Sequence, residues 1–349
     1  MTNAATWQHR VAEGIRTLSP AYFALPMSTG IIALASDALG HGTAGRVFFA
    51  LNNVEYAALA VLYILRLTFF FPQFRNDLAA HRKGAGFLTI VAASCLLGQE
   101  YAHFPGNHAV ATAFWVTGLI TWLFFAYTFF ILVTVRAHKP SLERGINGTW
   151  LLFVVSVQAL AILACTNVLH WTIPPRTTLF TALLFHLLGW LFYLVFIGII
   201  FYRTIFTVLR ANEFEPSYWI NMGAAAITSL AGSTLAETVG EHALWTELVP
   251  TLKVLTVFAW IAGVWWIPVV FVVGLWRLGS VPVRYQPGYW SMVFPLGMYT
   301  LCTWHLAGLF NVPLLKDISP LFIWVAWGAW LVTAIGMWMR IGKVYLLGR

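Results

Sequence analysis

Long apolar stretches separated by short polar segments dominate the hydrophobic pattern of the chain. Ten of them have about the length that a helix needs to cross a bilayer, ~20 mostly apolar residues. They lie at residues 20–37, 44–69, 87–102, 109–135, 148–168, 178–203, 217–237, 247–275, 288–309 and 319–341. None shows the apolar–polar alternation of a barrel strand. The pattern therefore predicts an all-α polytopic membrane protein with ten transmembrane helices.

The connections between these stretches are too short for a separate soluble domain. The longest is the segment 70–86, with about 17 residues. We expect one transmembrane domain over residues 20–341, an N-terminal arm of residues 1–19 and a short tail of residues 342–349. The arm is polar and lacks the apolar core of a signal peptide. It is interpreted as a retained cytoplasmic segment.

Composition and charge support this picture and add an orientation. The chain is 60% hydrophobic and 9% charged, whereas soluble domains carry roughly 25% charged residues. If the N-terminus is cytoplasmic, 16 of the 20 Lys and Arg residues fall on the cytoplasmic side, which obeys the positive-inside rule. The other four are Arg46, Arg176, Lys253 and Lys316. We therefore expect a protein of the cytoplasmic membrane with both termini on the cytoplasmic side. The net charge of +8 then indicates the lipid bilayer, rather than nucleic acid, as the partner.

Helix-breaking residues concentrate in three of the shorter, odd-numbered stretches. They are Pro20, Pro26 and Gly30 in the first, Pro216, Gly223 and Gly232 in the seventh, and Pro295, Gly297 and Gly308 in the ninth. A break frees backbone groups, which is tolerated at membrane depth only where protein or a water-filled cavity satisfies them. We expect the odd stretches to face an interior with a permeation path, and the long even stretches to face lipid.

Few ionisable residues lie inside the apolar stretches, and no carboxylate lies near a predicted midplane. Glu55, Glu100, Glu237 and Lys253 are expected to be solvated or paired at the outer ends of their helices, with a vestibule lining as the alternative. Among the histidines, His305 is the one plausible titratable group in a path.

Enzyme and cofactor signals are weak. The three cysteines lie singly in apolar stretches, and the chain has no GxSxG, HExxH or P-loop motif. His186 and His305 are the deepest histidines and could form one axial haem pair, but no second deep pair exists. We expect no enzyme activity, no metal and no cofactor, and keep a redox subunit that binds haem or quinone as an alternative.

Three motifs in order resemble one family. They are PAYFALPMSTGIIALAS at 20–36, EPSYWINMGAAAITSLAG at 215–232 and YWSMVFPLGMYTL at 289–301. With ten spans, they resemble the tellurite-resistance and dicarboxylate-transporter family, which includes the slow anion channels of plants. The resemblance implies five helical hairpins around a central pore, with the odd helices lining it, and a homotrimer. It also implies that Phe294, beside the kink of the ninth helix, plugs the pore.

The predicted function is an anion channel or channel-like transporter. It would move small anions such as malate and other dicarboxylates, sulfite, nitrate, chloride or tellurite-type oxyanions through a mostly neutral pore with a basic cytoplasmic mouth. A proton-coupled dicarboxylate or sulfite transporter that uses His305 is the alternative. Phe294 is the expected gate. The expected kink residues are Pro295, Gly297, Pro26 and Gly30. The expected pore-lining residues are Phe23, Met27, Ser28, Thr29, Asn221, Gly223 and Thr300.

Overall fold

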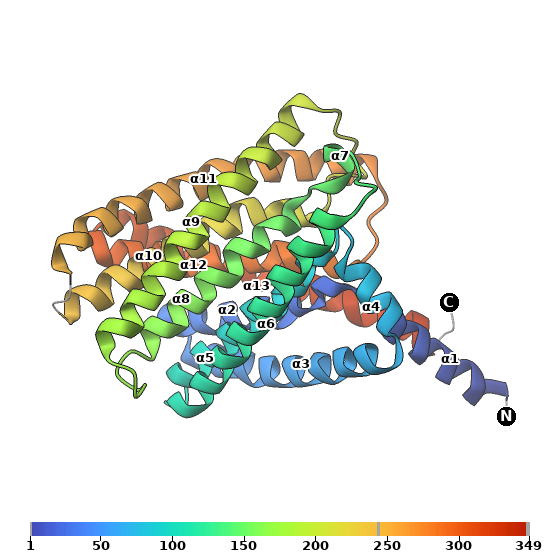
Figure 1. The fold of residues 1–349 in the computed structure, drawn as a ribbon, viewed down its shortest axis with the longest axis horizontal. Coiled ribbons are helices and arrows are strands. Elements are labelled where there is room, and N and C mark those ends of the chain that lie inside the picture. Colours follow the sequence, from blue (N-terminus) through green and yellow to red (C-terminus); the bar gives the residue numbers. More distant parts are fainter. Residues whose placement is uncertain (1, 243–244, 347–349) are drawn as a thin grey trace.

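The computed structural model describes residues 2–242 and 245–346, and these form a bundle of helices of two lengths (Figure 1). The described residues include five inner helices: α2 (Ala24–Ala38), α5 (Thr89–His103), α8 (Leu152–Thr166), α10 (Ile220–Glu241) and α12 (Trp290–Phe310). They also include five longer outer helices: α3 (Gly42–Phe69), α6 (His108–Val135), α9 (Pro175–Phe206), α11 (Val249–Ser280) and α13 (Pro313–Ile341). Each predicted stretch thus coincides with one helix.

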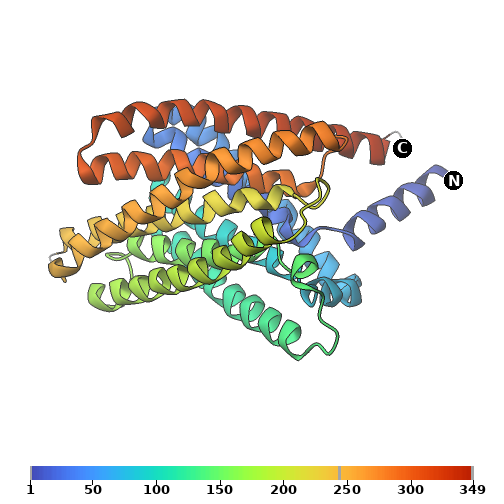
Figure 2. The same ribbon diagram turned by 90° about the horizontal axis from the view of Figure 1, so that it is seen from above.

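Shorter helices complete the structure. The predicted N-terminal arm forms the helix α1 (Thr2–Arg16), and α4 (Phe71–Leu78) and α7 (Leu142–Gly145) lie between longer helices. A π-helical turn, Gly342–Leu346, extends α13, while residues 347–349 of the predicted tail lie outside the described residues. The arm and α13 end at the same side of the bundle (Figure 2).

The inner helices form a closed ring. Each packs along the outer helix that follows it in the chain: α2 on α3, α5 on α6, α8 on α9, α10 on α11 and α12 on α13. The inner helices also contact one another in the order α2, α5, α8, α10, α12, and α12 contacts α2 again.

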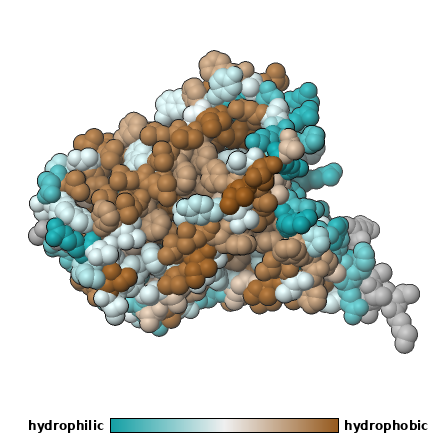
Figure 3. Space-filling model, viewed as in Figure 1, coloured by the Kyte–Doolittle hydropathy of each residue, from teal (hydrophilic) through white to brown (hydrophobic). Residues whose placement is uncertain are grey.

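Burial separates the two sets of helices. In the most apolar part of the α5 and α8 segments, 89% and 94% of the residues are buried, compared with 17% in α3. The outer helices carry large apolar side chains on an exposed face, which gives the brown surface between the more polar ends in Figure 3. The expected difference in burial between the odd and the even helices is confirmed. That the odd helices surround a permeation path stays a prediction.

Among the described residues, eight helices are long and apolar enough to cross a membrane, and a ninth span results if the pair Trp7–Arg16 and Pro20–Ala38, bent by 84°, is counted as one. This makes the chain a multi-pass membrane protein. The helix α10 is not in this set because Ser, Thr, Gly and Glu residues lower its apolarity. A helix surrounded by other helices does not need to be apolar on every side, so the count of ten spans stays a prediction.

A structural repeat opens every inner helix. Each begins with a 3₁₀ turn: η1 (Pro20–Phe23), η2 (Gly84–Leu88), η3 (Gly148–Leu151), η4 (Pro216–Trp219) and η6 (Pro287–Tyr289). Each turn starts with Pro or Gly and includes an aromatic residue, and the starts are 64 to 71 residues apart. The turns contact one another around a ring of their own, so the N-termini of the five inner helices lie at one end.

Candidate functional site

The first two turns of α12 are held closely between α2 and α10. Pro295 lies inside α12, where it cannot donate a backbone hydrogen bond, yet the helix continues to Phe310. A Cβ atom on Gly223 of α10 would lie 2.7 Å from Cγ of Pro295. On the other side, a Cβ atom on Gly297 would lie 2.9 Å from Cγ2 of Ile31 of α2. Both glycines therefore allow a close approach between inner helices.

A buried hydroxyl also ties α2 to α12. The Ser28 Oγ lies 2.7 Å from the carbonyl oxygen of Ala24 and 2.8 Å from that of Trp290. Its single hydrogen is shared between the two carbonyls. This contact fixes the depth of α2 relative to the start of α12.

Phe294 lies on the face of α12 that is turned away from the outer helices. The opposite face is marked by Thr303, whose Oγ1 accepts a hydrogen bond of 3.0 Å from Nε1 of Trp260 in α11. Nine residues separate Phe294 from Thr303, which corresponds to about 180° around a helix with ~100° per residue. Phe294 thus lies between the neighbours that Pro295 and Gly297 contact and is fully buried. Its position is that of a residue facing the centre of the ring.

Two of the expected lining residues have partners in the outer layer. Phe23 packs edge-on against Tyr56 and Tyr63 of α3, with ring centroids 5.4 Å and 5.1 Å apart. The Thr29 Oγ1 accepts a hydrogen bond of 2.9 Å from Nε1 of Trp330 in α13. Neither side chain is therefore directed towards the centre of the ring.

Asn221 also faces away from the centre. It shares a face of α10 with Thr228, seven residues further on, whose Oγ1 lies 3.3 Å from Nε2 of Gln158 in α8. Asn221 is fully buried, and among the described residues neither polar atom of its side-chain amide has a hydrogen-bond partner. Buried amides of this kind usually bind internal water. Asn221 therefore belongs to the packing between α8, α10 and the outer helices.

The two remaining lining candidates stay inside the inner layer. The Thr300 Oγ1 donates to the carbonyl oxygen of Leu296 in its own helix, at 2.9 Å. Met27 is fully buried on α2, one turn before Ile31. Hydroxyls inside the bundle are thus mostly satisfied by backbone carbonyls, as a membrane interior requires.

The expected kink residues of α2 do not interrupt this helix. Pro26 lies in its first turn, where the missing N–H is tolerated, and α2 runs to Ala38. A Cβ atom on Gly30 would lie 2.7 Å from Nδ2 of Asn52 and 3.0 Å from Oε2 of Glu100. Gly30 therefore serves close packing.

Glu100 differs from the solvated or paired residue that the sequence predicts. It is fully buried, accepts a hydrogen bond from the Asn52 amide, and has no ion-pair partner within the described part of the chain. The tertiary packing of α5 against α2 and α3 buries it. By contrast, Glu237 lies at the helix end with Oε2 3.4 Å from Nδ1 of His305, and both side chains are about one-third exposed.

The two deep histidines have different partners. Nδ1 of His186 lies 2.9 Å from Oε1 of Gln158, whereas His305 contacts Glu237 as described above. The described residues contain no group of three or more His, Cys, Asp or Glu side chains that could hold a metal ion. The two histidines thus belong to separate polar contacts.

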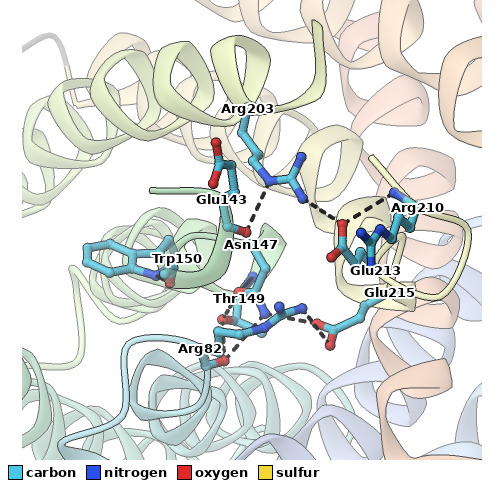
Figure 4. Close-up of polar contacts among 10 residues, drawn as sticks. Arg82, Glu143, Asn147, Thr149, Trp150, Arg203, Arg210, Glu213 and Glu215 are labelled. Atoms are coloured by element: carbon cyan, nitrogen blue, oxygen red, sulfur yellow. Dashed lines mark hydrogen bonds and ion pairs between the residues drawn. The ribbon is translucent and has the colours of Figure 1, made fainter. Parts of the chain in front are cut away.

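Ion pairs connect the loops at the end where the 3₁₀ turns lie (Figure 4). Nη2 of Arg82 is 2.8 Å from Oε1 of Glu215, directly before η4, and the Asn147 amide, directly before η3, donates to the same carboxylate at 2.9 Å. Nη2 of the buried Arg203 lies 3.0 Å from Oε2 of Glu213. The Arg210 backbone N–H and Arg203 lower the pKa of Glu213. These contacts fix the loops from which α8 and α10 start.

The site thus belongs to a multi-pass membrane protein with a ring of buried inner helices, and Phe294 is buried on the face of α12 opposite to its contact with α11. The family model for voltage-dependent anion channels matches residues 17–338, so the chain belongs to this family. The membership predicted from the three motifs is confirmed.

Similar proteins are described as membrane proteins or transporters. An uncharacterized transporter of Methanocaldococcus jannaschii is 23% identical over 346 residues, covering 95% of this chain and 94% of its own. A second uncharacterized transporter of the same organism is 22% identical and covers 95% and 96%. An uncharacterized membrane protein of Mycobacterium tuberculosis is 33% identical over 137 residues, which is 39% of this chain and 69% of its own length.

Proposed function

We propose that the protein conducts small anions through the centre of the inner ring and that Phe294 is the gate. The observation that carries the proposal is the place of Phe294: fully buried, and on the face of α12 opposite to the contact with α11. Pro295 against Gly223 and Gly297 against Ile31 hold its backbone between two neighbouring inner helices. A side chain so placed closes a central path as long as it keeps its rotamer.

Two features favour anions over cations. The N-termini of the five inner helices lie at one end of the ring, where aligned backbone dipoles create positive potential. The second feature is the direction of the buried carboxylate Glu100, which is hydrogen-bonded to Asn52 of the outer helix α3. Because Glu100 is held on the outer side of α5, it does not place a negative charge in the proposed path. Family membership points to the same class of substrate.

The proposed lining is more apolar than the sequence predicts. It includes Met27, Ile31 and Phe294, with Ser28 and Gly223 at the contacts that position them. Phe23, Thr29 and Thr300 are left out because their contacts are with outer helices or with their own backbone. Asn221 is left out because it shares the face of α10 that carries Thr228, which contacts Gln158 of α8. Selectivity then rests on the potential at the helix N-termini rather than on hydroxyl groups.

The proposed substrates, membrane orientation and oligomeric state are those expected from the sequence and its family resemblance. The anions are small carboxylates or oxyanions such as malate, sulfite, nitrate, chloride or tellurite. The protein lies in the cytoplasmic membrane with both termini inside, and its subunits form a homotrimer with one path each, built from five hairpins that span the membrane ten times.

Anion flux into liposomes with wild type and Phe294→Ala tests the gate. Exposing a buried Phe side chain costs ~1.5–3 kcal/mol, so its removal raises the flux about tenfold to a hundredfold if the ring must leave its position. Phe153→Ala is the matched control. Phe153 is equally buried, but its ring packs 4.7 Å from Phe130 of the outer helix α6.

The proposed gate is refuted if Phe294→Ala and Phe153→Ala change the anion flux by the same factor. A flux that requires a pH gradient and disappears in His305→Gln instead favours the proton-coupled transporter, because the His305–Glu237 contact joins α12 to α10. Chloride, nitrate, sulfite and malate are compared in the same liposomes to rank the substrates.

A further inference from the structure

Three outer helices end with an arginine at the same position. Arg66 in α3, Arg203 in α9 and Arg277 in α11 each lie three residues before the last residue of the helix. The three helices occupy equivalent places after α2, α8 and α10, and their ends lie on the side of the 3₁₀ turns. The arginines are therefore equivalent positions of the structural repeat.

Two of these arginines have a carboxylate supplied by the following segment of the chain. Arg66 forms an ion pair with Asp77, and its side chain is 1% exposed. Arg203 forms an ion pair with Glu213, and its side chain is 2% exposed. A buried guanidinium requires such a partner, because an unpaired charge away from water is costly.

Arg277 lacks an equivalent partner. The segment that follows α11, VPVRYQPGY at 281–289, contains no Asp or Glu. Nη1 of Arg277 lies 3.4 Å from the Tyr289 hydroxyl, its Nε is buried without a hydrogen-bond partner, and no carboxylate within the described ranges forms an ion pair with it. The third repeat position thus leaves an anion site open.

This site adjoins an apolar crevice. A cavity of about 230 Å³ between the turn η4, the end of α11 and the start of α12 is lined by Arg277 together with apolar residues that include Trp219 and Met292. Gly274 lies in its wall: a Cβ atom there would be in ordinary contact with Trp219, 3.7 Å from Cζ2, so a larger side chain at this position would extend into the cavity. Phe271, 53% exposed, forms part of its wall on the outer face of α11.

The carboxylate in the wall of the crevice is already neutralised. Glu215 lines the cavity, but its Oε1 lies 2.8 Å from Nη2 of Arg82 and its Oε2 accepts from Asn147. The guanidinium of Arg277 therefore determines the charge that the crevice accepts.

We propose that this crevice binds an anionic phospholipid, with the phosphate at Arg277 and part of an acyl chain against Trp219 and Phe271. The cavity is smaller than the ~300–1,000 Å³ of pockets that enclose a whole soluble ligand. Its walls are apolar and reach the lipid-facing side of α11, so a chain can enter from the bilayer. Basic residues at the membrane surface attract anionic headgroups. The site does not depend on the function proposed above.

Native mass spectrometry of the delipidated full chain in detergent tests the proposal, with phosphatidylglycerol and phosphatidylcholine as probes. We expect wild type to bind phosphatidylglycerol more tightly. Arg277→Gln removes one basic group and weakens this binding about fivefold. Gly274→Leu fills the crevice without a change of charge and weakens the binding of both lipids. Arg284→Gln is the control, because Arg284 is exposed in the same loop and does not line the crevice.

Several results overturn the proposal. One is equal binding of the two lipids by wild type. Another is an equal loss of phosphatidylglycerol affinity in Arg277→Gln and Arg284→Gln. Displacement of phosphatidylglycerol by millimolar inorganic phosphate would assign the site to a soluble anion instead. If Arg277→Gln changes the number of subunits but not lipid binding, the crevice is a contact between copies of the chain. If Gly274→Leu does not fold, the arginine variants and the comparison of headgroups still decide.

Discussion

The contact between Gly223 and Pro295 predicts that even one methyl group at position 223 displaces the gate helix. In Gly223→Ala the new Cβ would lie 2.7 Å from Cγ of Pro295 and 3.4 Å from its Cα. Carbon atoms pack best at ~3.5–4.0 Å, so α10 and α12 must separate by about 0.8 Å or more. The proline ring is fused to the backbone and cannot rotate away. The strain therefore falls on the two helices.

The size of the effect follows from a comparison of Gly223 in α10 with a glycine of α12. Overpacking of this kind costs ~1–3 kcal/mol, while replacing Gly by Ala inside a helix gains up to ~1 kcal/mol. Gly308→Ala is the matched control, because no atom lies within 4 Å of a Cβ at Gly308. The helix-propensity gain largely cancels between the two variants. We expect Gly223→Ala to be less stable than Gly308→Ala by ~1–3 kcal/mol.

Thermal unfolding in detergent, followed by tryptophan fluorescence, measures this difference. It corresponds to a melting temperature roughly 1–4 °C lower for Gly223→Ala than for Gly308→Ala. Anion flux of the same variants reports whether the displaced α12 moves Phe294. If Gly223→Ala melts at or above the temperature of Gly308→Ala, the close contact of α10 with α12 is refuted.

Two further predictions concern the end of the bundle that carries the 3₁₀ turns. Glu213→Gln removes the partner of Arg203 and costs roughly 1 kcal/mol at pH 7, a value reduced because the carboxylate is one-third exposed. Since the folded-state pKa of Glu213 is lowered, this stabilisation is complete above the pKa of the unfolded chain and is lost as the pH falls through the folded-state value. Gly148→Ala prevents folding, because its Cβ would lie 1.9 Å from the carbonyl oxygen of Ser217.

Melting temperatures between pH 7 and pH 3 check the first of these predictions. The difference between wild type and Glu213→Gln has to shrink below about pH 4, and a constant difference contradicts the ion pair. Size-exclusion chromatography checks the second. Gly240→Ala serves as control because its Cβ meets no atom within 4 Å, and a monodisperse Gly148→Ala protein contradicts the close packing of η3 on η4.

Several parts of the candidate site could be predicted from single residues. Pro295 and Gly297 marked the stretch of α12 that lies against α2 and α10. The family resemblance singled out Phe294 next to them, and its role as the gate stays a prediction. Backbone effects of Pro and Gly are local, so they remain visible in the sequence.

Other parts depend on which helix faces which neighbour. Asn221 looks like a lining residue in its motif, yet its position on α10 turns it towards α8. Glu100 lies near a helix end in the sequence, but α2 and α3 cover it completely. Successive residues point about 100° apart around a helix, so the orientation of the helix decides which neighbour each side chain faces. The sequence of one helix does not show how that helix is oriented within the bundle.

The sequence alone also did not show that Arg66, Arg203 and Arg277 occupy equivalent positions of a structural repeat. Each arginine was counted only as a basic residue in a loop or at a helix end. The structural repeat made the missing carboxylate of Arg277 visible, because it shows what the other two positions contain. The signal in the sequence was the spacing of 64 to 71 residues between the Pro or Gly residues that open the inner helices.

The sequence by itself determined the membrane location, the position of each helix along the chain and the division into inner and outer helices. These properties follow from apolarity and length, which act on each segment independently. Only the tertiary structure decided that the inner helices close into a ring, that Phe294 is buried on the face of α12 opposite to α11, and that Arg277 has no carboxylate partner among the described residues. Those properties arise from contacts between segments far apart in the chain, and the bilayer does not distinguish one arrangement of apolar helices from another.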